Sequence, residues 1–181
     1  MPRHVDPEVE GRILQAAQKL WHKGGEKALS MRAVAKAART NTPAVYRRFC
    51  SREELLRALV ARFRRDLYGV LEPCRTHQEF AQAYLKFALG RPREYEVINS
   101  GLLARLDDRP NFDFAARRSA DWLGGSPSEQ RRLIFAIAAL AHGTAMYIIT
   151  RTVLDADVEE LKAAFARSVD ALVENADKLR E

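Results

Sequence analysis

The side chains best suited to chemistry in this sequence are basic and polar residues between positions 30 and 52. Arg32, Arg39, Arg47 and Arg52 can neutralise phosphates, and Asn41 can exchange hydrogen bonds with base edges. No Ser/His/Asp order, paired carboxylates or metal-ligand spacing stands out, so an enzyme that uses an aromatic pocket is a much weaker interpretation. The pattern therefore indicates a protein that binds a polyanion.

The charge of the chain is divided unevenly along its 181 residues. The formal net charge is +6, yet residues 1–65 hold 15 basic and 6 acidic residues, while residues 66–181 hold 15 basic and 18 acidic residues. The first third therefore carries +9 and the remainder −3. An ordinary solvated surface can also be basic, but the concentration at one end favours a polyanion partner for that end.

Composition excludes several other classes of protein. Hydrophobic residues make up 47% and charged residues 30%, as in a folded globular chain. We expect no signal peptide, no apolar run close to the roughly 18 residues of a membrane span, and hence a cytoplasmic protein. Cys50 and Cys74 provide no disulfide framework, and the four histidines share no metal-ligand spacing. We therefore expect no cofactor and no metal.

Helix start and stop signals recur along the whole chain, and no strand alternation is seen. Asp6-Pro7-Glu8 combines a cap, a proline and a first-turn acid, and Ser51–Glu54 and Thr76–Glu79 are capping boxes. Ser126–Glu129 is the clearest start signal. We predict an all-α fold of nine helices at about 7–24, 30–38, 42–48, 51–73, 76–90, 92–106, 112–123, 127–151 and 155–179.

The second and third predicted helices form a helix-turn-helix over residues 30–49, braced by the longer first helix. The second helix of such a pair can enter the major groove of DNA and present side chains to the bases. Val45 and Phe49 supply the apolar back that this helix needs, and Asn41, Thr42 and Arg47 supply its polar front. Trp21 and Phe49 are predicted core residues of this small bundle.

The stretch from Ile13 to Leu56 resembles the DNA-binding domain of the tetracycline-repressor (TetR) family. The resemblance implies an all-helical, homodimeric transcription regulator, usually a repressor that a small ligand releases from its operator. The matching residues are, in order, Ile13-Leu14, Ala16-Ala17, Leu20-Trp21, Gly24, Ser30, Arg32, Val34-Ala35, Ala38, Tyr46, Phe49 and Ser51-Arg52-Glu53-Glu54-Leu55-Leu56.

The resemblance also implies roles for single residues. Tyr46 matches a tyrosine that usually contacts a phosphate, and Arg52 matches a lysine that contacts the DNA backbone at the start of the fourth helix. Thr42, Ala44 and Arg47 match positions that face bases or sugar-phosphate. The predicted DNA contacts are Arg32, Arg39, Asn41, Thr42, Ala44, Tyr46, Arg47 and Arg52.

The sequence departs from the family pattern in the turn. Arg39 stands where the family favours glycine, Thr40 where it favours an apolar residue, and Pro43 where a small residue is common. A positive φ at Arg39 would cost roughly 1 kcal/mol or more. We therefore expect a turn of slightly different geometry.

The remainder of the chain is predicted to carry a ligand site. Residues 84–95 and 139–143 look like one recurrent type of C-terminal domain in the family. Core packing explains any single aromatic residue, and a core or interface role explains His142, but together the aromatic residues fit an apolar or aromatic ligand. The candidate ligand contacts are Tyr68, Tyr84, Phe87, Tyr95, Ile98, Leu102, Trp122, His142 and Met146.

The last two predicted helices are candidates for a dimer interface. In the final helix, apolar residues recur at steps of about three and four, so helices 127–151 and 155–179 can pair with a second copy or pack within their own subunit. We favour the homodimer, because one helix-turn-helix reads too few base pairs for useful specificity. The predicted domains are a DNA-binding domain at 7–67 and a regulatory and dimerisation domain at 68–181.

The predicted function is a ligand-responsive regulator that binds a palindromic operator in double-stranded DNA as a dimer. A ligand that binds the C-terminal domain better when the two recognition helices are widely spaced must weaken operator binding by the same factor. The alternative is an architectural DNA-binding protein with no inducer and no operator preference. Its affinity for DNA would fall with rising salt but would hardly vary with DNA sequence.

Overall fold

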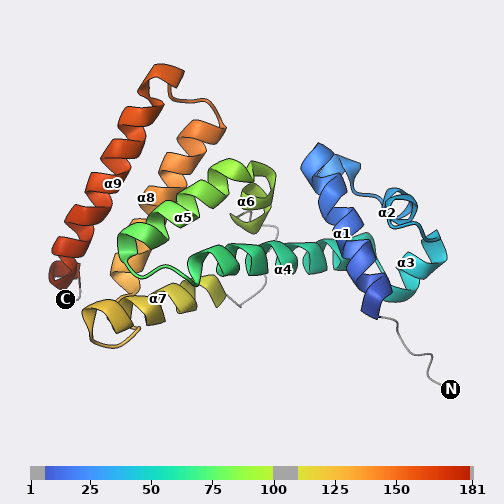
Figure 1. Cartoon of the computed structure of the whole chain (residues 1–181), viewed down its shortest axis with the longest axis horizontal. Helices are drawn as coiled ribbons and strands as arrows, with labels where there is room; N and C mark the ends of the chain where they lie inside the picture. The colour runs from blue at the N-terminus through green and yellow to red at the C-terminus, as the bar shows by residue number, and fades with distance from the viewer. Residues whose placement is uncertain (1–6, 100–109, 180–181) are drawn as a thin grey trace. The chain divides into compact units, whose positions relative to one another are not determined.

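A computed structural model describes residues 7–99 and 110–179, and these residues form nine α-helices and no strand (Figure 1). The predicted all-α, nine-helix fold is thus confirmed. The helices are α1 (Pro7–Gly24), α2 (Met31–Ala37), α3 (Thr42–Arg48), α4 (Arg52–Leu71), α5 (His77–Gly90), α6 (Pro92–Asn99), α7 (Pro110–Leu123), α8 (Arg131–Ile149) and α9 (Val158–Glu174). Three short 3-10 helices accompany them: η1 (Gly25–Ala28), η3 (Asp155–Asp157) and η4 (Ala176–Leu179).

Four helices begin at the caps that the sequence predicts. The side-chain oxygen of each cap accepts a hydrogen bond from the backbone N–H three residues later, at 3.2 Å for Ser30, 2.8 Å for Asn41, 3.1 Å for Ser51 and 3.1 Å for Thr76. Each bond satisfies one of the N–H groups that a helix start leaves without a partner. Local sequence therefore sets where α2, α3, α4 and α5 begin.

Two predicted helices differ from the structure by four residues or more at one end. The helix predicted from Pro127 begins instead at Arg131, because a turn comes first: the Glu129 N–H donates to the Ser126 carbonyl at 3.1 Å. The final helix was predicted to continue to Leu179, but α9 ends at Glu174 and a 3-10 turn follows. The part of the sixth predicted helix beyond Asn99 lies outside the described residues.

The described residues divide into two compact units, an N-terminal unit of residues 7–65 with 93–99 and a C-terminal unit of residues 66–92 with 110–179. The core of the N-terminal unit joins α1, α2, α3, the first part of α4 and α6. Ile13, Val34 and Val45 are fully buried there. The predicted core residues Trp21 and Phe49 are each only 4% exposed, as expected.

Helix α6 belongs to the N-terminal unit, whereas the predicted domains placed residues 68–181 together. The reason is packing between segments far apart in the sequence. Val97 joins the core cluster of the N-terminal unit, and the indole N–H of Trp21 donates to the Arg93 carbonyl at 3.1 Å. A domain boundary drawn from local sequence alone does not detect such contacts.

The C-terminal unit is a helical bundle in which α5 and α9 both pack on α8, and α7 also contacts α8 (Figure 1). Leu85 and Ala88 of α5, Leu133 of α8, and Phe165 and Val169 of α9 are among its buried apolar residues. They lie at helical spacing on the inward faces of amphipathic helices, which is why these helices pack together.

Helix α8 corrects the expectation that no apolar run approaches the length of a membrane span. Among the described residues, it is the one helix that is long and apolar enough, by length and composition, to cross a membrane, and only 33% of its most apolar window is buried within the chain. Its outward residues Phe135, Ala139, His142, Met146 and Ile149 follow at steps of four and three, and so share one face. We call these five residues the outer stripe of α8.

Candidate nucleic-acid interface

Helix α3 presents a defined outer face because its inner face is fixed by packing. Val45 is fully buried in the core of the N-terminal unit, which turns Pro43, Tyr46 and Arg47 outward. Tyr46 is 49% exposed, a high value for an aromatic side chain. Thr42 and Ala44, which are also predicted DNA contacts, are half-buried on the same short helix.

Asn41 uses its side-chain carbonyl to cap α3, at 2.8 Å from the Ala44 N–H. Because the carbonyl is committed to the helix, the amide group of Asn41 is the part that remains for DNA. The proline at position 43 suits the first turn, where its missing N–H costs nothing. Together these residues hold the N-terminal turn of α3 in place.

The turn between α2 and α3 corrects the expectation of an altered geometry. Arg39 takes a left-handed conformation with φ of +53°, in the position where the family favours glycine. The Arg39 N–H donates to the Lys36 carbonyl at 3.2 Å, and the Thr40 N–H donates to the Ala35 carbonyl at 2.9 Å. This is the Schellman pattern that normally ends with glycine. The turn is therefore unaltered, and the arginine bears the strain.

Uncompensated positive charge surrounds the outer face of α3. Residues 27–52 contain seven basic residues and no acidic one. Arg32, Lys36, Arg39 and Arg47 are exposed, and none of them forms an ion pair with another described residue. Such an array attracts a polyanion, because each phosphate that binds releases condensed counterions.

Two arginines of the same region make contacts within the protein. The guanidinium of Arg52 donates to the carbonyls of Leu29 (2.8 Å) and Glu26 (3.0 Å), and it pairs with the Glu26 carboxylate at 3.1 Å. Arg48 pairs with Glu10 of α1. Sequence reasoning missed both partners because they lie far away in the chain. Arg52 therefore braces η1 against the start of α4, and its predicted phosphate contact stays a prediction.

These features define a class of protein, a helix-turn-helix protein whose recognition helix is flanked by cations. Residues 13–59 match the family described as bacterial regulatory proteins, tetR family. Residues 13–59 accordingly form a helix-turn-helix DNA-binding domain of the TetR type.

Several solved structures share the fold over nearly the whole chain. TetR-Q116A from Acinetobacter baumannii AYE, in complex with minocycline, has 20% identity and a TM-score of 0.70, and the match covers 98% of this chain and 99% of that chain. The multidrug binding protein EbrR, complexed with imidazole, has 22% identity and a TM-score of 0.63, covering 95% and 93%.

SCO4942 from Streptomyces coelicolor has 21% identity and a TM-score of 0.64, covering 91% of this chain and 97% of that chain. At these identities, the three likenesses establish the fold. No curated protein matches the chain significantly.

The structure distributes the candidate ligand contacts over several places. In the C-terminal unit, the ring of Tyr68 lies 4.4 Å from that of Phe114, and the ring of Trp122 lies 4.8 Å from that of His77. Phe87 is buried and Tyr84 is half-buried, both on α5. These four candidates therefore take part in aromatic and apolar packing of one unit.

The other candidates lie elsewhere. Tyr95 is fully buried and Ile98 packs on the core of the N-terminal unit, while Leu102 lies outside the described residues. His142 and Met146 belong to the outer stripe of α8. A cavity of about 30 Å³, the size of roughly one water, contains none of the candidates and is lined by Gln78, Ala81, Gln82, Phe165, Ala166, Val169 and Asp170.

A buried polar chain in the C-terminal unit resembles a catalytic pair but has the opposite polarity. Ser119 Oγ lies 2.7 Å from His77 Nε2 and donates to Gln130 Oε1 at 3.3 Å, and Gln130 Nε2 donates to the Gly124 carbonyl at 2.7 Å. Because the Ser119 proton goes to Gln130, His77 must be the donor to Ser119. His77 therefore does not act as a base toward this serine.

Burial governs the titration of this part of the protein. Burial lowers the pKa of His77 from 6.5 to about 4, so the ring is neutral at physiological pH. Burial, together with the nearby Glu79 carboxylate, raises the pKa of the Cys74 thiol. Among the described residues, no three His, Cys, Asp or Glu side chains gather where they could hold a metal ion.

Proposed function

We propose that the protein is a ligand-responsive repressor that acts in the cytoplasm and binds a palindromic operator as a homodimer. The observation that carries the DNA half of this proposal is the outer face of α3. This face presents Tyr46 and Arg47, and it is surrounded by the exposed cations Arg32, Lys36 and Arg39. A recognition helix with this arrangement can contact base edges with its front and phosphates with its flanks.

Arg47 is the residue for which we expect the largest loss on substitution. Arg47→Ala should weaken operator binding by about tenfold or more, because a groove contact contributes on the order of 1–3 kcal/mol. Tyr46→Phe, which removes one hydroxyl, should weaken binding less and equally for all sequences. The measurement is fluorescence anisotropy on an operator selected from random DNA.

Arg117→Ala is the matched control, since Arg117 is exposed on α7 and its loss changes the net charge equally. Unchanged affinity in Arg47→Ala and Tyr46→Phe would contradict the proposed docking. A selection that returns no preferred sequence would favour the architectural alternative, provided that the affinity for DNA still falls with rising salt.

The outer stripe of α8 supports the homodimer. This stripe is apolar apart from His142, and its aromatic side chain, Phe135, is 46% exposed in the single chain. An apolar face of this kind on a long helix is typical of a protein–protein interface. A Cβ added at Gly143 would meet no atom within 4 Å in the single chain, which leaves the helix surface open there to a second copy. We infer that α8 and α9 pair with their counterparts.

The ligand half of the proposal rests on the aromatic residues of the C-terminal unit and on two proteins of like fold, one solved with minocycline and one with imidazole. We infer a small apolar or aromatic ligand that contacts Tyr68, Tyr84, Phe87 and Trp122. By linkage, the factor by which the ligand lowers the affinity for the operator equals the factor by which the operator lowers the affinity for the ligand.

A thermal-shift screen of aromatic compounds, with minocycline and imidazole as first probes, would identify ligands. Each hit would then be titrated into the protein–operator complex. Release by a hit in the wild type, with resistance to release in Trp122→Leu, is the expected result. Hits that stabilise the protein but leave operator affinity unchanged would contradict a regulatory role for the ligand.

A further inference from the structure

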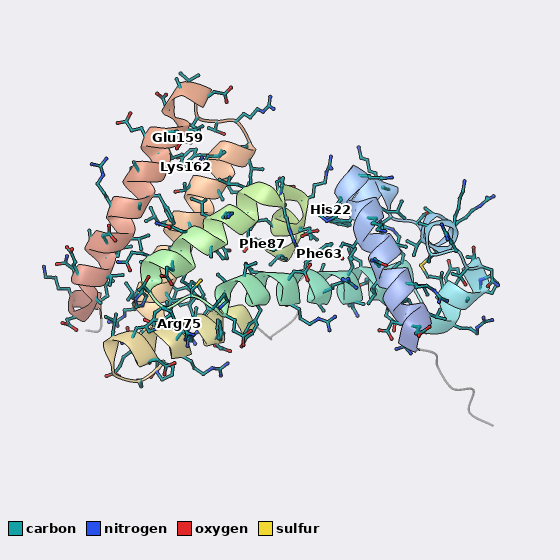
Figure 2. All side chains as sticks on the ribbon, viewed as in Figure 1. His22, Phe63, Arg75, Phe87, Glu159 and Lys162 are labelled. Carbon is teal, nitrogen blue, oxygen red and sulfur yellow. The ribbon has the colours of Figure 1, made fainter. Side chains whose placement is uncertain are left out.

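The end of α1 and the start of α6 are joined by three polar contacts, which we call the α1–α6 clamp. The Trp21 indole N–H donates to the Arg93 carbonyl at 3.1 Å, and the Arg93 guanidinium donates to the His22 carbonyl. His22 Nε2 lies 2.7 Å from Glu94 Oε1. Figure 2 shows His22 at this end of α1. All four residues belong to the N-terminal unit.

Glu94 is the buried member of the α1–α6 clamp. Its side chain is fully buried, whereas that of His22 is 47% exposed. A buried carboxylate is costly unless it is paired. Loss of either partner should therefore cost more free energy than the loss of a surface ion pair does. The neighbouring Tyr95 is also fully buried, and Val97 joins the core cluster. Polar and apolar contacts thus hold α6 in the N-terminal unit.

The course of the chain gives the clamp its importance. Helix α5 belongs to the C-terminal unit and ends at Gly90, and α6 begins at Pro92 with only Arg91 between them. Within residues 7–99, the chain passes between the units inside the continuous helix α4 and again at this junction. The clamp therefore ties the end of α1 to a segment that follows α5 almost directly.

We propose that Glu94 and His22 are positioning residues for operator binding. The clamp supplies the DNA-binding unit with a second attachment besides α4, which restricts its orientation in the dimer. Two recognition helices must keep a separation of about 34–36 Å to occupy both half-sites of a palindrome. Loss of the clamp adds freedom that must be removed on the full operator and not on a single half-site. This inference rests on the proposed dimeric, operator-binding function.

The test compares affinity for a full palindrome with affinity for one half-site in Glu94→Gln and His22→Gln. We expect full-operator affinity to fall by about two- to thirtyfold, the usual range for residues that couple two regions, with half-site affinity unchanged. The double variant should lose less than the sum of the two single variants, because both substitutions alter the same contact. A purely structural role would weaken both DNAs alike.

Glu96→Gln is the matched control, since Glu96 is an exposed carboxylate of the same helix. His22→Lys, which keeps a nitrogen donor opposite Glu94, should retain most of the full-operator affinity. If Glu94→Gln fails to fold, His22→Gln still decides the question, because it alters a half-exposed side chain.

Two outcomes separate the inference from the function on which it rests. A wild-type protein that shows no preference for the palindrome over the half-site overturns the dimeric operator model. A wild-type protein that prefers the palindrome, with clamp variants that prefer it equally, overturns the positioning role of Glu94 and His22.

Discussion

Two arginines of this protein occupy the same strained position in different turns. Arg39 follows α2 with φ of +53°, and Arg151 follows α8 with φ of +55°. As at Arg39, a pair of hydrogen bonds closes the second turn, from the N–H of Arg151 to the Ile148 carbonyl at 3.2 Å and from the N–H of Thr152 to the Tyr147 carbonyl at 3.0 Å. Positive charge beside a helix C-terminus compensates part of the strain.

Comparison of Arg39 with Arg151 separates the effect of backbone strain on stability from the effect of the side chain on operator binding. Arg39→Gly and Arg151→Gly should each stabilise the protein by about 1 kcal/mol, since glycine adopts this conformation without a Cβ clash. Only Arg39→Gly should weaken operator binding, because it removes a cation beside α3. Urea unfolding and anisotropy on the same two variants measure both effects. Equal operator affinity in the two variants would show that Arg39 is not a DNA contact.

His77 predicts a loss of stability in acid. The unfolded chain binds a proton at His77 near pH 6.5, and the folded protein does so only near pH 4, so the unfolded state holds more protons between these values. The free energy of unfolding should therefore fall as the pH is lowered from 6.5 to 4, by up to about 3 kcal/mol from this residue.

His77→Gln removes the titrating group and keeps a side chain that can bond to Ser119. Thermal unfolding at several pH values should show a flatter profile for this variant than for the wild type between pH 6.5 and 4. A profile as steep as that of the wild type would assign the acid sensitivity to other groups.

At the scale of the element, the cap of α3 is the feature with the most direct effect on recognition. Asn41 holds the first turn of a helix of only seven residues, and loss of a cap costs roughly 1 kcal/mol. Asn41→Ala should therefore lower operator affinity by up to about fivefold through fraying of α3.

Asn41→Ser distinguishes the cap from a base contact. Serine caps a helix as well as asparagine does but lacks the amide group. Affinity retained in Asn41→Ser and lost in Asn41→Ala would identify Asn41 as a cap. Equal loss in both, with the same selected operator, would identify its amide as a contact to DNA.

The helices follow from the sequence where their signals are local. Ser30, Asn41, Ser51 and Thr76 announce their caps within four residues, so the starts of α2 to α5 are predictable. The start of α8 is not, because the buried Gln130 reaches back to the Gly124 carbonyl and holds the preceding residues in a turn. A capping signature cannot reveal a tertiary contact of this kind.

The candidate site was predictable to a similar extent. The outer face of α3 follows from the burial of Val45, and its charge follows from composition. The commitment of Arg52 to Glu26 and Leu29, by contrast, depends on how η1 packs against α4. The same side chain could bind a phosphate or brace the protein, and only the fold shows which partners are near.

At the scale of the whole molecule, the outer stripe of α8 predicts assembly. Ala139 lies in the middle of this stripe and is exposed in the single chain. Ala139→Glu should therefore leave the isolated chain folded but bury a charge in the dimer, which should then dissociate. Sedimentation equilibrium measures the change of mass, and operator affinity should fall with it.

Ala61→Glu is the control for this experiment, because Ala61 is an exposed alanine on α4 outside the stripe. It should leave the mass of two chains unchanged. A dimer that survives Ala139→Glu would place the interface on another surface.

The division of the chain into units has a consequence for synthesis. The helix-turn-helix sequence is complete by Phe49, but the core beneath it also contains Val97, and Glu94 is seated at the end of α1. Chains emerge from the ribosome N-terminus first, so the core of the DNA-binding unit is complete only after α6 has been made. Because α5 precedes α6 in the chain, α5 is also complete by the time that operator binding can begin.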